Sequence, residues 1–187
     1  MTANYVISYK ELSGLNALEI SKKLKSMSGI KVKDLLISHL IFYNTQPIYT
    51  GNGVYLFKYN DVFVYVGSCV SRNFVDRIPA HFDLRTNGWL NSLLCRIISK
   101  EGKDKSTETL TEAATWAMNN CHLVLINFES EHYKRHHIKG LEDVLRHELK
   151  PYNFKKRKTY EDAHCLSDHF STLIEPVKKE KKKSIAV

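Results

Sequence analysis

The chain has 187 residues and a net charge of +8, a length that predicts one compact domain with extensions. Hydrophobic residues make up 43% and aromatic residues 11%, which excludes collagen-like, mucin-like and largely disordered chains. No apolar run approaches the roughly twenty residues that cross a bilayer, and the N-terminus lacks the pattern of a secretion signal, so we expect a soluble, cytoplasmic protein.

Residues 1–50 are predicted to form a helical N-terminal extension of two short helices. One apolar stripe precedes the Ser28–Gly29 break and another follows it, both near helical spacing. Because lysines flank the turn, the pair could be a helix-turn-helix-like DNA reader. We favour packing against the main core, since the second stripe is too apolar to lie freely in a groove.

The main domain is predicted over residues 51–155, after a loop containing Pro47 and Gly51. GVYLFKY and VFVYVGS flank Asn60–Asp61 and predict a β-hairpin over about 53–68. Further helices are expected after Ser71, over NGWLNSLLCRIISKEG and from Thr107 or Thr109 through Met118. HLVLINF at 122–128 predicts a central strand, and a last helix should stop before Pro151.

The predicted fold class is therefore an α+β or α/β sandwich. We expect a small three-stranded, mainly antiparallel sheet, made of the hairpin and the central strand and flanked by helices. A basic C-terminal tail over residues 156–187 completes the predicted organisation.

Charge is concentrated at the two ends of the chain. Residues 1–50 carry +3, residues 51–149 are neutral and residues 150–187 carry +5, which indicates a polyanionic partner, with nucleic acid first. Aromatic residues alternate with basic ones in KPYNFKKRK, a composition suited to stacking and phosphate contact. Its predicted nucleic-acid-binding residues are Lys155, Lys156, Arg157 and Lys158. KKEKKK at 178–183 fits a solvated, disordered tail equally well.

The cysteines and histidines do not match a standard metal site. Cys69, Cys95, Cys121 and Cys165 form no CxxC pair, so we expect reduced, buried thiols. The histidines of HHIKG and HCLSDH are expected at the surface because their spacing fits no common zinc pattern.

Two tyrosine–glycine triplets face each other across the predicted hairpin, Gly53-Val54-Tyr55 and Tyr65-Val66-Gly67. They are followed by Arg77 ten residues after Gly67, by His81 four residues later, by Glu142 in the last helix and by Asn153. Over residues 53–155 this set resembles the GIY-YIG nuclease superfamily, with valine replacing isoleucine in both triplets.

The resemblance implies hydrolysis of phosphodiester bonds in DNA with Mg²⁺ or Mn²⁺. It implies that Glu142 anchors the metal and that Arg77 stabilises charge on the phosphate, a task that suits a planar guanidinium. Tyr55 would activate water or relay a proton, Tyr65 would hydrogen-bond the water or phosphate, and Asn153 would fix the end of the last helix. The glycines would be structural.

Some assignments leave alternatives open. Pro79 lies between Arg77 and His81, so a late start or a kink of the helix could separate them, and Arg72 is then the fallback arginine. His81 could serve as base, acid or phosphate contact. Lys58 and Arg72 are also predicted to contact nucleic acid, although an exposed lysine is the commoner outcome on a strand. Each tyrosine could be cross-strand packing, and Glu142 with Arg146 could be a surface ion pair.

The predicted function is a metal-dependent DNA endonuclease of a restriction-type, phage-defence or mobile-element kind, acting on double-stranded DNA without a small-molecule cofactor or a membrane. The alternatives are a homing or structure-specific repair-type nuclease, an RNA-processing nuclease, and a non-catalytic DNA-binding regulator that keeps the fold. A homodimer could form through apolar helices at 12–42. We expect Tyr55, Tyr65, Arg77 and Glu142 to converge on one side of the sheet around a single hydrated cation.

Overall fold

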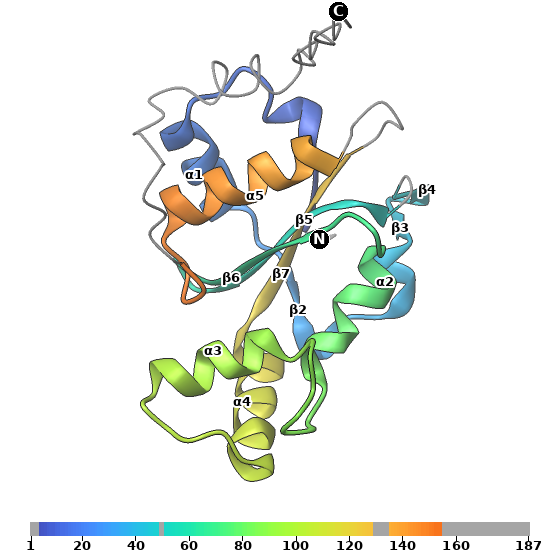
Figure 1. Ribbon diagram of the computed structural model, residues 1–187. Helices are drawn as coiled ribbons and strands as arrows, with labels where there is room; N and C mark the ends of the chain where they lie inside the picture. The colour runs from blue at the N-terminus through green and yellow to red at the C-terminus, as the bar shows by residue number, and fades with distance from the viewer. Residues whose placement is uncertain (1–3, 49–50, 129–134, 155–187) are drawn as a thin grey trace, which may run out of the picture.

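The computed structural model describes residues 4–48, 51–128 and 135–154. These residues form one mixed five-stranded sheet with helices on both faces and a small two-stranded sheet at the side (Figure 1). The sheet order is β1–β7–β5–β6, with β2 also paired to β7. The predicted mixed α and β class is confirmed, whereas the predicted count of three strands was too small.

The three predicted strands form the centre and one edge of this sheet. The hairpin is confirmed as β5 (Gly53–Tyr59) and β6 (Val62–Cys69), with a bulge between Phe57 and Lys58. β7 (His122–Asn127) pairs antiparallel with β5 on its other side. β6 is therefore an edge strand, and its outer edge is where the candidate site lies.

The prediction of a separate helical extension was wrong. β1 (Val6–Ser8) pairs parallel with β7, and β2 (Ile30–Lys31) pairs antiparallel with it, so the N-terminal region completes the sheet. The first predicted helix is present as α1 (Ala17–Ser26), capped by Asn16 and Glu19.

The second predicted helix is replaced by short turns and strands. These elements are η2 (Val32–Asp34), η3 (Ile37–Leu40), β3 (Phe42–Tyr43) and β4 (Gln46–Pro47), after an earlier turn η1 (Tyr9–Glu11). The apolar stripe misled the prediction because Val32 and Leu40 are buried, whereas Leu36 and Ile37 are exposed. A helix-turn-helix reader has no second helix here.

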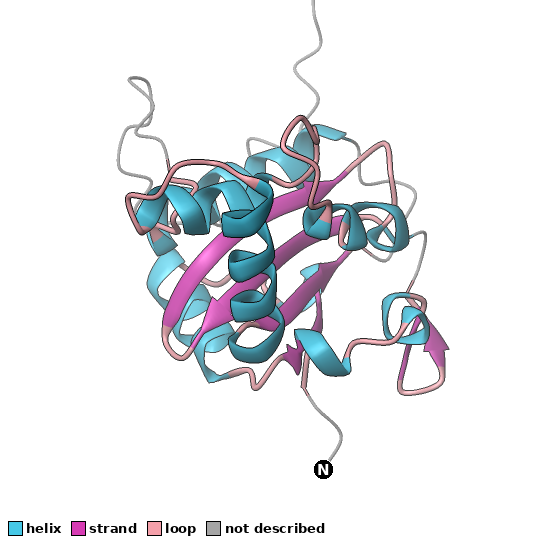
Figure 2. Ribbon diagram, turned by 90° about the horizontal axis from the view of Figure 1, so that it is seen from below, coloured by secondary structure: helices cyan, strands magenta, loops and turns pink. Residues whose placement is uncertain are grey.

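Each face of the sheet is covered by its own helices (Figure 2). One face packs against α2 (Phe74–Arg77), η5 (Pro79–Phe82), α3 (Ser92–Lys100) and α4 (Thr107–Asn120). The opposite face packs against α1 and α5 (Arg135–Leu149). Alternation along β5 assigns Tyr55 and Phe57 to the first core and Val54 and Leu56 to the second.

Lys58 does not lie at a nucleic-acid surface, which corrects its predicted role. Its side chain is buried, and its ammonium donates hydrogen bonds to the carbonyls of Lys25 and Met27 at the end of α1. Burial lowers the pKa of Lys58. The bulge in β5 thus places a lysine where it satisfies helix carbonyls that would otherwise lack partners.

The three described cysteines are unpaired thiols, as predicted, and Cys69 and Cys121 are buried. Burial raises the pKa of each of these two thiols to about 12, so neither is a reactive thiolate at neutral pH. Cys165 and the HCLSDH stretch lie outside the described residues. His137 is buried rather than at the surface as expected. Within the described part of the chain, no helix has the length and apolarity to span a membrane.

Candidate active site

Each glycine of the tyrosine triplets lies where a side chain would collide with a neighbouring group. The Tyr55 ring lies across Gly67 on the neighbouring strand, so a Cβ there would overlap the phenol ring and its hydroxyl. A Cβ on Gly53 would meet the Ile126 carbonyl oxygen. Gly67 thus lets the Tyr55 ring lie against β6, and Gly53 lets β5 approach the backbone of β7.

Arg77 and His81 come from two different short elements. α2 ends at Arg77, and Pro79 opens the 3₁₀ turn η5 that carries His81. Proline fits the first position of such a turn because it has no N–H to leave unpaired. The break anticipated at Pro79 is therefore present, yet both side chains still reach the hydroxyl of Tyr55.

The hydroxyl of Tyr55 connects these side chains. It lies 2.6 Å from Nε2 of His81, and the charge of Arg77 acts on it. On the other side of the imidazole ring, the Leu93 N–H donates to Nδ1 at 3.4 Å. Because Nδ1 accepts, the ring proton sits on Nε2, which faces the Tyr55 oxygen.

Burial sets the protonation states in this cluster. His81 is fully enclosed, and burial together with the charge of Arg77 lowers its pKa to about 3, so the imidazole is neutral at pH 7. Burial and the nearby Tyr65 raise the pKa of Tyr55 well above its ordinary value, although Arg77 partly lowers it. Tyr55 is 0% exposed in this structure. The predicted role of Tyr55 as a water-activating base or proton relay stays a prediction.

Tyr65 lies on the same face but its hydroxyl points elsewhere. It is 2.8 Å from Oγ of Ser92, at the start of α3, and its ring packs edge-on against His81. It does not stand directly opposite Tyr55, because Tyr65 pairs with Phe57 and Tyr55 pairs with Gly67. Tyr65 therefore tethers α3 to the cluster and encloses the imidazole, in place of the predicted contact with water or phosphate.

Glu142 belongs to a second cluster on the opposite face of the sheet. Its carboxylate is 3% exposed and lies 2.6 Å from Nη2 of Arg146, 2.7 Å from Nζ of Lys139 and 2.6 Å from Oγ of Ser68. Two cations and a hydroxyl thus hold a buried carboxylate. The i,i+4 spacing of Glu142 and Arg146 had left open a simple ion pair at the surface, whereas this pair is part of a buried cluster.

The predicted convergence of four groups around one cation is not found. Side chains alternate along β6, so Gly67 faces Tyr55 and Arg77 while Ser68 faces Glu142. Both clusters nevertheless border the same end of the edge strand. The charges of Arg77, Glu142 and Lys139 all act on the thiol of Cys69.

A basic pocket opens at this end of β6 and spans both faces. It has a volume of about 280 Å³ and is bordered by the last residues of β6 and the loop that follows. Its cationic side chains come from three parts of the chain: Arg72, Arg77, Arg135 and Lys139. Such a cluster suits the oxygens of a phosphate group. Arg72, the fallback arginine, therefore joins Arg77 instead of replacing it.

Asn153 covers the outer edge of β6 instead of acting in proton transfer. Its amide accepts from the Val66 N–H at 3.1 Å and donates to the Val66 carbonyl at 2.7 Å, as a neighbouring strand would. Arg146 donates to the same carbonyl. Asn153 thus fixes the segment after α5, as predicted, and protects an open edge.

Several residues of the site were missed by sequence reasoning. Lys139 and Arg146 flank Glu142 at i−3 and i+4, a spacing that signals ion pairs on a helix, although only Arg146 was noted. Ser68 follows Gly67 directly, and a single serine on a strand carries no pattern that predicts its contact with Glu142. Lys155, Lys156, Arg157 and Lys158 lie outside the described residues.

Glu142 is the residue that could hold a divalent cation. The ammonium of Lys139 stands where such a cation would bind Oε2, and the Lys139 side chain is 46% exposed and has room to turn away. Oε1 remains tied to Arg146. Among the described residues no group of three or more His, Cys, Asp or Glu side chains gathers, so any cation here would keep most of its ligands as water or phosphate oxygens.

Stability is expected to fall as pH drops from 6.5 to 4.5 because His81 is held neutral in the folded state. Its pKa falls from about 6.5 when unfolded to about 3 when folded, so the unfolded state binds the extra proton in this window. Wild type should lose about 2–3 kcal/mol more of its unfolding free energy than His81→Gln. Urea titrations at several pH values measure the difference.

The comparison of these two proteins isolates His81 from other titrating groups. His122, whose pKa is also lowered by burial, is present in both. Asp83, whose pKa is lowered to about 2 by hydrogen bonds from Arg85, titrates below the chosen window. Parallel pH profiles for wild type and His81→Gln would contradict the assignment.

No protein-family model, curated protein or solved structure matched the chain in our comparisons.

Proposed function

We propose that this protein is a DNA endonuclease that hydrolyses phosphodiester bonds at the outer end of β6. The observation that carries the proposal is the basic pocket, in which Arg77 from one face of the sheet and Lys139 beside Glu142 from the other border one space. The resemblance of Tyr55, Tyr65, Arg77, His81, Glu142 and Asn153 to the GIY-YIG pattern supports the same class.

Arg77 is the residue assigned to the reacting phosphate. Its guanidinium interacts with the hydroxyl of Tyr55, which is itself fixed by His81, and this arrangement supports a direction that is set before substrate binds. As water adds to phosphorus and the bond to the leaving 3′ oxygen breaks, negative charge grows on the phosphate oxygens. A preorganised guanidinium stabilises that charge more than a mobile one does.

The remaining cations bind and align the strand. Arg72, Arg135 and Lys139 border the pocket and are suited to flanking phosphates. Glu142 would hold the Mg²⁺ or Mn²⁺ implied by the resemblance, which supplies a Lewis acid and a source of hydroxide when bound. For that role Lys139 has to leave the carboxylate, and its half-exposed side chain permits it.

Plasmid cleavage tests the proposal. Supercoiled DNA incubated with wild type and Mg²⁺ should be nicked or linearised, while Arg77→Ala and Glu142→Gln should leave it intact. EDTA should also stop cleavage by wild type. If none of the three proteins cleaves the plasmid, although circular dichroism shows that each is folded, the nuclease proposal is overturned.

A non-catalytic nucleic-acid-binding protein is the second candidate, favoured by the contacts of Glu142. Both carboxylate oxygens already have partners, and two cations balance the charge. In that case the basic pocket should bind DNA with unchanged affinity in EDTA and show no cleavage at any metal concentration.

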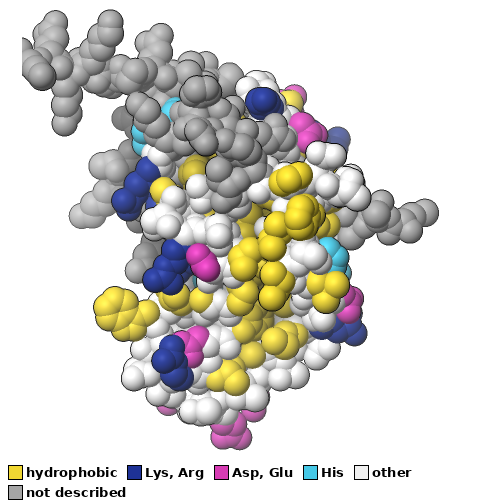
Figure 3. All heavy atoms as spheres, turned by 90° about the vertical axis from the view of Figure 1, so that its right-hand side faces the viewer, with side chains coloured by type: hydrophobic (Ala, Val, Ile, Leu, Met, Phe, Trp, Pro, Cys, Tyr) yellow, Lys and Arg dark blue, Asp and Glu magenta, His cyan; other side chains and the backbone are white. Residues whose placement is uncertain are grey.

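A role in restriction, phage defence or mobile-element conflict remains the proposed biological setting, with double-stranded DNA as partner. The proposed homodimer would use the exposed apolar side chains in and beside η3 and β3, which are Leu36, Ile37, Ile41 and Phe42. Figure 3 shows apolar side chains gathered in a band on the side of the molecule where these elements lie.

A further inference from the structure

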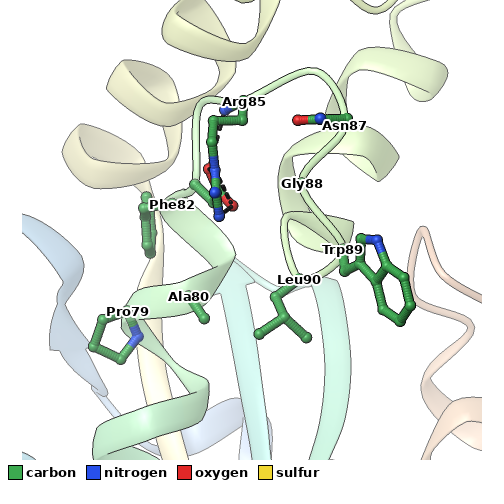
Figure 4. A pocket seen from close by; sticks show the side chains of 9 residues that line it. Pro79, Ala80, Phe82, Arg85, Asn87, Gly88, Trp89 and Leu90 are labelled. Carbon is green, nitrogen blue, oxygen red and sulfur yellow. Dashed lines mark hydrogen bonds and ion pairs between the residues drawn. The ribbon is translucent and has the colours of Figure 1, made fainter.

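The loop between η5 and α3 presents an indole to solvent beside the candidate site. Trp89 is 95% exposed, although a large aromatic side chain is ordinarily at least half covered. Figure 4 shows it pointing away from the ribbon at the rim of a pocket, next to Leu90. Packing within the described residues does not account for this position.

The loop that carries Trp89 is held firmly. Arg85 and Asp83 form a forked ion pair with an N–O distance of 2.7 Å, and the Asn91 amide donates to the carbonyls of both residues. Gly88 permits the tight turn, because a Cβ there would meet the Asp83 carboxylate and the Arg85 carbonyl. The exposed indole is therefore placed by a built loop, so little order has to be gained on binding.

The space beside Trp89 has the character of a base-binding surface. The pocket has a volume of about 550 Å³ and combines apolar walls at Pro79 and Phe82 with polar groups at Arg85 and Asn87 (Figure 4). Flat apolar surfaces accept the face of a nucleobase, and amide and guanidinium groups can bond its edge.

This pocket adjoins the basic pocket of the proposed nuclease. Leu90 borders both pockets. A strand whose phosphates lie against Arg77 and Arg72 would thus place a base within reach of Trp89. The cations of the basic pocket suit the phosphate of a nucleotide, and the aromatic surface of Trp89 suits its base.

We propose that Trp89 is a stacking platform for an unpaired base, so that the double-stranded DNA taken as partner is bound where it opens and leaves a base unpaired beside the bound phosphates. A base within an intact duplex already stacks on its neighbours and does not offer its face to a side chain. This inference rests on the proposed function, because it names the form of DNA that the same site accepts.

Fluorescence titration in EDTA tests the inference without cleavage. Trp116→Phe leaves Trp89 as the one tryptophan of the sequence and serves as the reference protein. A single-stranded oligodeoxynucleotide of about 16 residues should quench its emission, and a duplex of the same sequence should quench it much less. Anisotropy of labelled DNA measures affinity for both forms.

Substitution of Trp89 should then change the affinity for single-stranded DNA much more than the affinity for duplex DNA. Trp89→Ala is expected to weaken single-strand binding by about 5- to 150-fold and duplex binding by less than about 3-fold, with Trp89→Phe recovering most of the loss. Arg72→Ala is the matched comparison and should weaken binding to both forms alike. Equal affinity of Trp89→Ala and the reference protein for single strands would overturn the inference, as would equal losses on both forms.

The outcome is separable from that of the proposed function. If single-stranded DNA alone quenches Trp89 and Trp89→Ala weakens only single-strand binding, while wild type does not cleave plasmid, the stacking platform is supported and the nuclease proposal is overturned. If wild type cleaves plasmid and Trp89→Ala binds both forms of DNA as the reference protein does, the nuclease proposal is supported and the stacking platform is overturned. Absence of binding to both forms of DNA would overturn both.

Discussion

Replacing Arg77 by lysine is expected to slow plasmid cleavage by about 100-fold or more, although the positive charge is kept. The guanidinium borders the basic pocket, and its charge interacts with the buried hydroxyl of Tyr55. Lysine has a single ammonium on a flexible stem, so it cannot make both contacts with a fixed direction. Arg77→Ala should be slower still.

Matched measurements decide whether the loss is catalytic. Arg96→Lys, on α3 and outside both pockets, should cleave at the wild-type rate. DNA affinity of Arg77→Lys should fall by less than about 10-fold, because the charge that attracts the polyanion is retained. A rate for Arg77→Lys within about 3-fold of wild type would contradict the role given to the guanidinium.

Replacing Gly67 by alanine is expected to destabilise the protein by about 1–3 kcal/mol. The Cβ would occupy the place of the Tyr55 ring, which is fully buried and cannot move without breaking its bond to His81. Gly67 has no positive φ, so alanine imposes no backbone strain. Guanidinium unfolding measures the change.

The same substitution in a Tyr55→Ala background supplies the control. With the ring removed, Gly67→Ala should be neutral or stabilise the strand by a few tenths of a kcal/mol, because alanine restricts the unfolded chain. The interaction energy between the two positions should thus exceed about 1 kcal/mol. Equal costs of Gly67→Ala in both backgrounds would show that the close approach to Tyr55 does not explain the glycine.

Local patterns along the chain were sufficient for much of the fold. Alternating β-rich runs on either side of Asn60–Asp61 predicted β5 and β6, and a short apolar run predicted β7. Each of these patterns lies within one strand, so it can be recognised without knowing which strands pair. The pairing of β1 and β2 with β7 is long-range, and strands of two or three residues leave too little pattern to detect.

The predicted site was correct in part, because order along the chain does not specify the face of a sheet. Tyr55, Arg77 and His81 come together, and the glycine of each tyrosine triplet has a steric reason. Glu142 lies on the other face because α5 packs with α1, a choice made by the second core. Burial of the Tyr55 hydroxyl likewise depends on α3 and η5, which close over it.

The most direct test is a double-mutant cycle on single-turnover cleavage with Arg77→Ala, Glu142→Gln and both together. If the two residues act on one phosphate across the end of β6, the double variant should be no slower than the slower single variant. Rate losses that multiply, or cleavage that persists in both single variants, would show that the two faces of the sheet do not form one catalytic site.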